Sequence, residues 1–322
     1  MSSYNKIGQK ITSFEGNPDY TGVSTAISKD GKVIAVGSIY HNTNHGLVRI
    51  YEWNDTSEEW DQMGQNIVGD LFISDIPDNL GRRICLSGDG KVVAIYAGKP
   101  AYAAVYEWKE DDAGVLNWIK RETSESSGNF EDLHYGDAPK IALSNDGSII
   151  ALSDPMPSNR YGEKVFTYKW ENDTWTSLGV IWKGPSYFPT DPRGEGTREG
   201  DPPGTTPTVN YGENDFGSAV ALSDDGLTMV IGAQKGGHTH AAGAAYVYTF
   251  VDDAWELEYQ WISDTNHING AMDLGCAACI SGDGKTICVG SFQYVVAVLI
   301  KDADGNWGEK VFSEAWSGNR FF

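Results

Sequence analysis

Short apolar runs separated by polar turns fill this chain, and five of the turns share one pattern of residues. Each has small or apolar residues, then Ser-x-Asp-Gly, then a second apolar run. The five serines are Ser28, Ser87, Ser144, Ser223 and Ser281, at spacings of 59, 57, 79 and 58 residues. A pattern that recurs at such a period indicates a repeat architecture, namely a propeller, a solenoid or an array.

Every repeat predicts the same four strands. Asp-Gly between two apolar runs is a strong hairpin signal, because glycine accepts a positive φ and aspartate hydrogen-bonds its own backbone. The second strands are 33–36, 92–95, 149–152, 229–231 and 287–289, and the third strands are 48–53, 104–108, 165–170, 245–250 and 295–300. A tryptophan opens each fourth strand: Trp60, Trp118, Trp175, Trp255 and Trp307. Four short antiparallel strands are typical of a propeller blade, and near-continuous apolar first and second strands indicate coverage on both faces.

The predicted fold is therefore an all-β propeller of four-stranded antiparallel blades, as a single domain over residues 1–322. Its repeat units span about 12–70, 71–125, 126–184, 212–263 and 264–322. Residues 6–11 echo residues 62–67 of the first fourth strand, so 1–11 is predicted to be a closing or edge strand. Because the last unit has a fourth strand of its own, five blades are favoured, and a sixth, incomplete blade stays open.

A glycine stands six residues before most repeat serines, and the fourth unit begins with Asn214-Asp-Phe-Gly217. It continues with Val230-Ile-Gly-Ala233 and Gly243-Ala-Ala-Tyr-Val-Tyr248. In these motifs nearly the whole chain resembles FG-GAP-type propeller repeats. No unit has the Asp-x-Asp/Asn-x-Asp-Gly calcium loop, so the resemblance is to the divergent form without calcium. Similar repeats are encoded by microalgae and the large DNA viruses that infect them, which implies a structural or adhesive role, such as a virion component.

The net charge of −21, from 45 acidic against 24 basic residues, makes the chain strongly acidic. It argues against nucleic acid and anionic membranes as partners, because both require basic patches. No stretch approaches 18 apolar residues, so no membrane insertion is expected. The N-terminus lacks the apolar core of a signal peptide. Localisation stays open, with synthesis in the cytoplasm and incorporation into a virion as expectations.

The four cysteines predict buried free thiols. Cys85, Cys279 and Cys288 stand where other units have alanine in the strands, which suits a reducing compartment. Cys276 and Cys279 are three residues apart in a strand and point to opposite faces, so they are no redox or zinc pair. Cys279 and Cys288 face each other across a hairpin, which leaves a disulfide as the alternative.

Two enzyme motifs are missing from the sequence. A sialidase-type Asp box needs Ser-x-Asp-x-Gly-x-x-Trp, whereas glycine here follows the aspartate directly. No Gly-x-Ser-x-Gly nucleophile elbow exists either. The repeat aspartates are read as turn formers: Asp30, Asp89, Asp146, Asp225 and Asp283. We therefore expect no enzyme, no catalytic residue, no metal site and no cofactor.

All six histidines fall in predicted loops. His41 and His45 lie between strands two and three of the first unit, and His238 and His240 lie in the same loop of the fourth. In a propeller these loops share one rim with the connections between units, so a His- and Asp-rich top face is expected, beside the plainer reading of solvated polar loops. A His-x-His pair could chelate a metal if a third ligand converged. A pH-sensitive contact surface is favoured over that.

Residues 185–211 form a Pro/Gly-rich insertion. Such a segment cannot pack a core, so it is either a surface loop or an arm that orders against a partner. Tyr187 and Phe188 at its base, and Arg193 and Arg198 within it, join the histidines as candidate partner-binding residues.

The function that the sequence favours is a non-enzymatic structural or protein-interaction module. It would dock protein partners in a larger assembly through the top face and the inserted arm. A glycan-binding propeller is the alternative, and an enzyme with a site in the central funnel is the third possibility.

Overall fold

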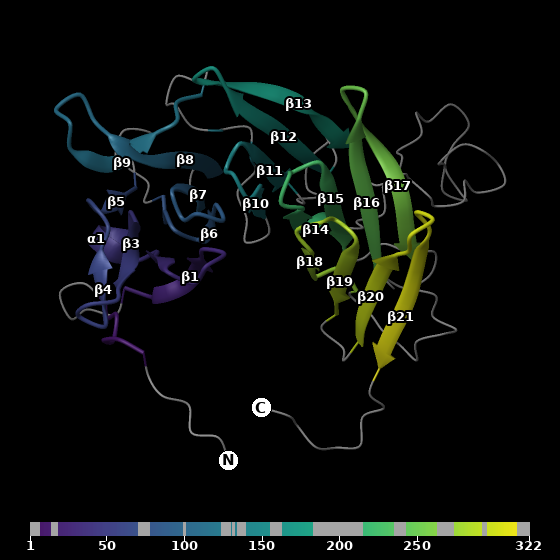
Figure 1. Cartoon of the computed structure of the whole chain (residues 1–322), viewed down its shortest axis with the longest axis horizontal. Helices are drawn as coiled ribbons and strands as arrows, with labels where there is room; N and C mark the ends of the chain where they lie inside the picture. The colour runs from purple at the N-terminus through teal and green to yellow at the C-terminus, as the bar shows by residue number, and fades with distance from the viewer. Residues whose placement is uncertain are drawn as a thin grey trace, which may run out of the picture. The chain divides into compact units, whose positions relative to one another are not determined.

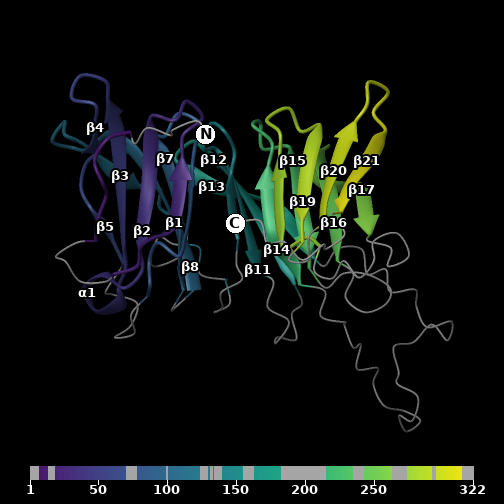
Figure 2. The same ribbon diagram turned by 90° about the horizontal axis from the view of Figure 1, so that it is seen from below.

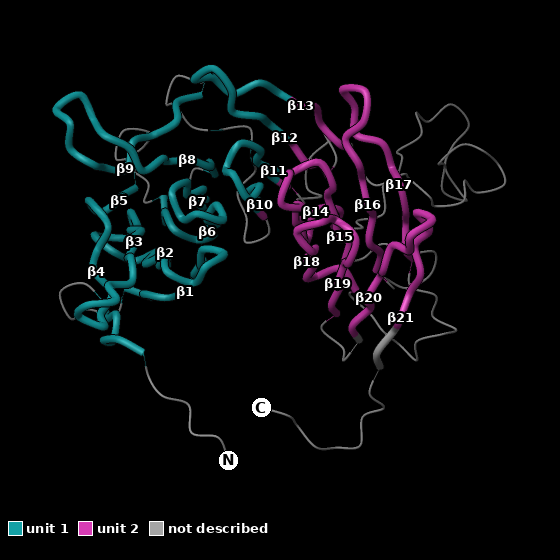
Figure 3. The backbone as a smooth tube through the Cα atoms, viewed as in Figure 1, with its two compact units in different colours: residues 1–137, 141–152, 167–177 teal, residues 138–140, 153–166, 178–322 magenta. Residues whose placement is uncertain are grey.

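A computed structural model describes residues 7–13, 19–69, 78–98, 101–123, 130, 133, 140–154, 163–182, 215–234, 243–262, 274–291 and 295–313. The chain divides into two compact units, coloured separately in Figure 3. The first holds residues 1–137, 141–152 and 167–177, and the second holds 138–140, 153–166 and 178–322. The third of the sheets below therefore has residues in both units.

The described strands form five antiparallel sheets, and each sheet lies within one predicted repeat unit (Figure 1). Blade one has β1 (Thr21–Ile27), β2 (Val33–Ser38), β3 (Leu47–Asn54), β4 (Glu59–Gln62) and β5 (Ile67–Val68). Blade two has β6 (Arg83–Leu86), β7 (Val92–Gly98), β8 (Ala101–Glu110) and β9 (Leu116–Lys120). Blade three has β10 (Ile141–Leu143), β11 (Ile149–Asp154), β12 (Lys164–Glu171) and β13 (Thr174–Trp182). Blade four has β14 (Phe216–Leu222), β15 (Thr228–Ala233), β16 (Ala244–Val251) and β17 (Ala254–Ile262). Blade five has β18 (Ala277–Ile280), β19 (Thr286–Gly290), β20 (Val295–Lys301) and β21 (Trp307–Ser313).

The fourth strand of blade one is interrupted. β4 pairs with the end of β3 at Trp53 and Trp60, whereas β5 pairs with the start of β3. Between them the chain leaves the ladder at Gly64, whose φ of +73° suits glycine. This break turns the segment toward blade two, where it makes the contacts described below.

The second strands form the core, as their apolar sequences predict. Every residue of β7 and β11 is buried, so both faces of these strands are covered. Figure 2 shows β1, β2 and β3 of blade one side by side. The same expectation is wrong for β1, in which Val23 is 41% and Ile27 63% exposed. β1 is an edge strand that packs on β6. A strand with neighbours on one face keeps the other face in solvent.

The Ser-x-Asp-Gly turns are built as the sequence predicts. In all five, the serine Oγ donates to the aspartate Oδ1 at 2.6–2.7 Å. The same Oγ accepts the backbone N–H five residues later at 2.9 Å, which closes the hairpin. The aspartate accepts the N–H two residues on, and the glycine φ lies between +70° and +75°.

Replacing Ser87 by alanine should test this turn. Ser87 is fully buried, so the N–H of Val92 would lose its acceptor out of reach of water. We expect a loss of about 1–3 kcal/mol in the free energy of unfolding. Ser281 makes the same bonds at a more exposed turn, so Ser281→Ala should cost less in the same urea titration. Equal losses would contradict the burial argument.

Successive blades also contact each other at the turn glycines. A Cβ on Gly90 would lie 2.5 Å from Cβ of Val33 in blade one, and a Cβ on Gly147 would lie 2.6 Å from Cβ of Val92 in blade two. Gly31 of blade one has the same φ, but a Cβ there would meet no described atom within 4 Å. The glycine therefore serves both the turn and the blade-to-blade contact.

Candidate protein-interaction surface

The two ends of the blades are built differently. The turn end holds the Ser-x-Asp-Gly turns and the hairpins between third and fourth strands. The loop end holds the connections between second and third strands and those from one blade to the next. The second-to-third connections of blades one to three run over residues 39–46, 99–100 and 155–163. The second-to-third connections therefore vary in length, whereas the Ser-x-Asp-Gly turns keep one length in all five blades.

The loop end of blade one contains two of the predicted partner-binding residues, His41 and His45. They flank the single turn α1 (His41–Asn44), in which Asn42 and Thr43 have positive φ. The side-chain amide of Asn79 donates to Asn44 O at 3.1 Å, and its backbone N–H donates to the same oxygen at 2.9 Å. The segment that leads into blade two thus fixes the conformation of this loop.

His45 faces inward, in contrast to the expectation of an outer His-rich face. Its side chain is 13% exposed, and its Nδ1 lies 3.8 Å from Oδ1 of the buried Asp78. Tyr102 donates its hydroxyl to the other oxygen of Asp78 at 2.5 Å. Any side chain on Gly69 would clash with this carboxylate. The sequence does not show this cluster, because its members are far apart in the chain and Tyr102 lies in β8.

Two tyrosines lie exposed at the same end of blade one. Tyr20 precedes β1 and is 59% exposed, and Tyr40 follows β2 and is 43% exposed. Their ring centroids are 4.6 Å apart in an edge-to-face arrangement. The N–H of Tyr40 donates to Asp19 O, and Tyr20 holds a φ of +58°, which is unusual for a bulky residue. Nothing in the sequence pattern marks Tyr20, because its conformation depends on Asp19 and the end of β2.

The expectation that the two loop classes meet at one end is confirmed within each unit. In the first, Gly46 after α1 forms a parallel bridge with Leu80, just before blade two. In the second, Gly243 before β16 forms the same bridge with Leu274, just before blade five. The remaining candidates lie outside the described residues and stay predictions: Tyr187, Phe188, Arg193, Arg198, His238 and His240, together with the insertion 185–211.

At the turn end, backbone hydrogen bonds join successive blades. The N–H of Lys29 donates to Gly88 O at 2.8 Å, and the N–H of Gly88 donates to Asn145 O at 2.7 Å. In the second unit, the N–H of Asp224 donates to Gly282 O at 2.9 Å. These residues all occupy the variable position of Ser-x-Asp-Gly, so this end is a scaffold.

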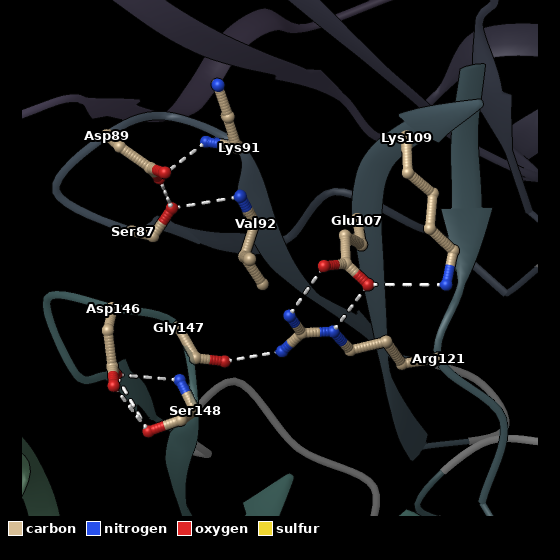
Figure 4. Close-up of polar contacts among 10 residues, drawn as sticks. All are labelled: Ser87, Asp89, Lys91, Val92, Glu107, Lys109, Arg121, Asp146, Gly147 and Ser148. Carbon is tan, nitrogen blue, oxygen red and sulfur yellow. Dashed lines mark hydrogen bonds and ion pairs between the residues drawn. The ribbon is translucent and has the colours of Figure 1, made fainter. Parts of the chain in front are cut away.

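Arg121 adds a side-chain clamp between blades two and three (Figure 4). Its guanidinium lies 3.2 Å from Glu107 Oε1 and donates to Gly147 O at 2.6 Å. It also stacks over Trp170, with Cζ 5.2 Å from the ring centroid. Burial raises the pKa of Glu107, but Arg121 and Lys109 together outweigh it, and the net pKa is lowered. Arg121 is thus held by partners from both blades, and the cluster has a structural role.

The pKa values of Asp30, Glu107 and Asp283 are all lowered. The pKa of Asp30 falls because Ser28 and then the backbone of Lys32 hydrogen-bond its charged form, and that of Asp283 falls through Ser281 and Lys285. No group of three or more His, Cys, Asp and Glu side chains converges on a metal position among the described residues. In the same part of the chain, no helix is long and apolar enough to span a bilayer.

The four cysteines are free thiols. Cys279 is opposite Cys288 in the β18–β19 ladder, as predicted, but no disulfide joins them. The expectation of burial holds only in part: Cys85, Cys276 and Cys288 are half-buried, and Cys279 is exposed, because β18 presents alternate residues to solvent. Burial raises the pKa of the Cys85 thiol to about 12, and its Sγ donates to Ile141 O at 3.0 Å.

Alkylation rates should separate these thiols. At pH 8 a thiol with a pKa near 12 is about one part in ten thousand thiolate, the reactive form. We expect iodoacetamide to label Cys279 at least a hundredfold faster than Cys85 in the folded protein, as read by peptide mass spectrometry. In urea the two rates should converge. Equal rates without urea would contradict the burial of Cys85.

The start of blade four is held by a buried carboxylate. Glu163 accepts the backbone N–H groups of Asp215 at 2.8 Å and Phe216 at 2.9 Å. Phe216 is fully buried, with its ring 5.5 Å from that of Tyr246. Gly217 follows with a φ of +93°, and a Cβ there would lie 2.9 Å from Ser153 Cβ. The Phe-Gly pair thus begins blade four: Phe216 fills the core, and Gly217 allows a close approach to Ser153 of blade three.

Residues 210–248 match the family model of the FG-GAP repeat. This stretch contains β14, β15 and most of β16. No match was found among curated proteins.

Solved structures share the fold at low identity. Saccharomyces cerevisiae Sqt1 is similar with a TM-score of 0.53 and 9% identity, over 98% of this chain and 68% of that one. The periplasmic gluconolactonase PpgL of Pseudomonas aeruginosa has a TM-score of 0.50 and 16% identity, over 94% and 74%. A likeness to Kuenenia stuttgartiensis hydrazine synthase, with a TM-score of 0.49 and 12% identity, covers 86% of this chain and 64% of that one, less than two thirds of its length. At these identities the first two likenesses show the fold alone.

The sheets and the comparisons agree on one architecture. Each of the five sheets has the antiparallel order of a blade, and the FG-GAP match falls on the unit with the most complete motif. The chain is therefore an all-β propeller protein of five four-stranded blades that carries an FG-GAP repeat.

Proposed function

We propose that this propeller is a non-enzymatic protein-interaction module that docks partners through its loop end. The observation that carries the proposal is the exposed pair Tyr20 and Tyr40 on blade one. Aromatic side chains held rigidly in solvent supply much of the binding energy at protein interfaces. Tyr20 holds a left-handed backbone to reach this position, a strain that is typical of functional sites.

The contrast between the two ends of the blades supports the same proposal. The Ser-x-Asp-Gly turns repeat one geometry, whereas the second-to-third connections at the loop end change in length from blade to blade around fixed anchors such as Asn79. Function in repeat scaffolds is concentrated in such variable loops on a rigid frame. The lowered pKa values of Asp30, Glu107 and Asp283 favour structural roles for these acids, because a general acid at neutral pH needs a raised pKa.

A finer form of the proposal places the protein in a larger assembly. The partner would be a protein, and its surface would carry basic groups to match the net charge of −21. Residues 185–211 would act as an added arm, and the FG-GAP resemblance supports a structural setting such as a viral particle.

The test is co-purification from the natural source of a tagged chain with Tyr20→Ala and Tyr40→Ala together. We expect at least a tenfold loss of associated protein. Val115→Ala and Leu116→Ala remove apolar groups of similar exposure from the turn end of blade two, so this matched control should change nothing. A deletion of 188–208 should leave a folded propeller that associates less. Equal recovery in all variants, or a free monomer in the unmodified protein, would contradict docking and direct attention to glycan arrays and activity screens.

A further inference from the structure

The contact between blades one and two has a recognisable form at the outer strands. At blade two, the side chain of Gln65 brackets the backbone of Trp118: its Oε1 accepts the Trp118 N–H at 3.0 Å and its Nε2 donates to Trp118 O at 2.8 Å. The indole N–H of Trp118 donates to Met63 O at 2.8 Å. Any side chain on Gly64 would clash with the ring of Trp108. The end of blade one thus docks as apolar-Gly-Gln on a tryptophan pair.

Blade one has the same tryptophan pair. Trp53 and Trp60 lie with ring centroids 5.2 Å apart, as Trp108 and Trp118 lie at 5.4 Å. Residues 7–13 cover this pair without joining the sheet as a strand. In the structure the N-terminal segment therefore occupies on blade one the position that Met63–Gln65 occupies on blade two. Residues 7–13 do not form the closing or edge strand expected from the sequence.

The glutamine bonds and the close approach of the glycine both have counterparts in the N-terminal segment. Gln9 Nε2 donates to Trp60 O at 2.6 Å, and Gln9 Oε1 accepts the Trp60 N–H at 2.8 Å. Gly8 has a φ of +70°, and a Cβ there would lie 2.9 Å from Trp53 Cζ3 and 2.8 Å from Trp60 Cδ1. In addition, the buried Arg49 donates from Nη2 to Thr12 O at 2.7 Å.

We propose that blade one carries a peptide-binding site for an extended apolar-Gly-Gln-x-apolar segment, and that residues 7–13 fill it as an intramolecular ligand. The described bonds to this segment run from the side chains of Gln9 and Arg49, not through a strand ladder. A site of this kind is specific for sequence. The glutamine side chain bonds both the N–H and the C=O of one residue, and glycine is required where the tryptophan rings approach the backbone of the segment. It accepts the same sequence from a separate peptide when the attached segment is weakened. The proposal does not depend on docking at the loop end.

The experiment uses the full chain with Gly8→Val and Gln9→Ala together, which weakens the attached segment. Hydrogen exchange is measured over residues 59–62, where the Trp60 N–H is protected by Gln9 in the unmodified protein. We expect exchange there to rise at least tenfold. A peptide of residues 7–13 should restore protection and should bind this variant at least tenfold more tightly than the unmodified chain, whose site is filled.

Matched peptides and variants distinguish sequence-specific binding from nonspecific binding. The peptide with Gln9→Ala should bind at least tenfold more weakly, whereas Lys10→Ala, at an exposed side chain, should bind equally. In the full chain, Gln65→Ala should raise exchange over 116–120, and the peptide of residues 7–13 should not reverse it, because Met63 and Gly64 still occupy that contact. Unchanged exchange at 59–62 in a folded Gly8→Val/Gln9→Ala variant would overturn the proposal. Equal binding of the Gln9→Ala peptide would overturn it as well. If the double variant does not fold, exchange in full-length Gln9→Ala alone, with and without peptide, decides the question by the same criteria.

Discussion

Replacing Trp118 by alanine is expected to lower the free energy of unfolding by about 3–5 kcal/mol, the range for deletion of a buried tryptophan. The ring is 2% exposed and belongs to the core shared by blades one and two. Its removal opens a cavity at the contact with Trp108 and leaves Met63 O without its indole donor. Urea unfolding of the folded variant measures the loss.

Two comparisons identify the cause of that loss. Trp118→Phe keeps a ring but loses the bond to Met63 O, so it should cost about 1–3 kcal/mol. Trp60→Ala should cost less than Trp118→Ala, because Trp60 is half-buried whereas Trp118 is buried. A loss below about 1 kcal/mol for Trp118→Ala would contradict a packed contact between these blades.

Replacing Gly90 by alanine is expected to cost about 2–5 kcal/mol. The left-handed backbone, with a φ of +71°, accounts for about 1–2 kcal/mol of this. The new methyl would lie 2.5 Å from Cβ of Val33, and overpacking of this kind adds about 1–3 kcal/mol.

Gly31→Ala is the matched control for this substitution. Its φ of +75° is nearly the same, but a methyl there meets open space, so only the backbone cost of about 1–2 kcal/mol is expected. Thermal or urea unfolding of the two variants measures the difference. If both lose the same stability, the turn glycine serves its own hairpin only, and the proposed contact between blades contributes nothing.

Local signals in the sequence predict most of the fold. The Ser-x-Asp-Gly pattern places every first hairpin, because serine, aspartate and glycine act within one turn. The predicted third strand 48–53 is observed as β3, and Trp60 lies in β4 as expected. These features depend on residues close together in the chain, so their pattern is sufficient.

The candidate surface is harder to predict from the sequence, because the orientations of its side chains depend on residues far away in the chain. The inward direction of His45 depends on Asp78 and Tyr102. The resemblance of residues 6–11 to 62–67 is visible in the sequence, but the reason for it is not: Gln9 and Gln65 each bracket a tryptophan from another hairpin. The exposure of β1 likewise depends on which neighbours cover it, not on its apolar sequence.

Crosslinking mass spectrometry of the protein recovered from its natural source tests the docking account most directly. A photoreactive crosslinker that inserts into any residue is used, because residues 38–46 contain neither an acidic residue nor a lysine. If the propeller is a docking module, it should be recovered in a large particle, with intermolecular crosslinks concentrated at residues 38–46, 184–211 and 234–242. A free monomer without intermolecular crosslinks, or crosslinks confined to the Ser-x-Asp-Gly turns, would contradict it.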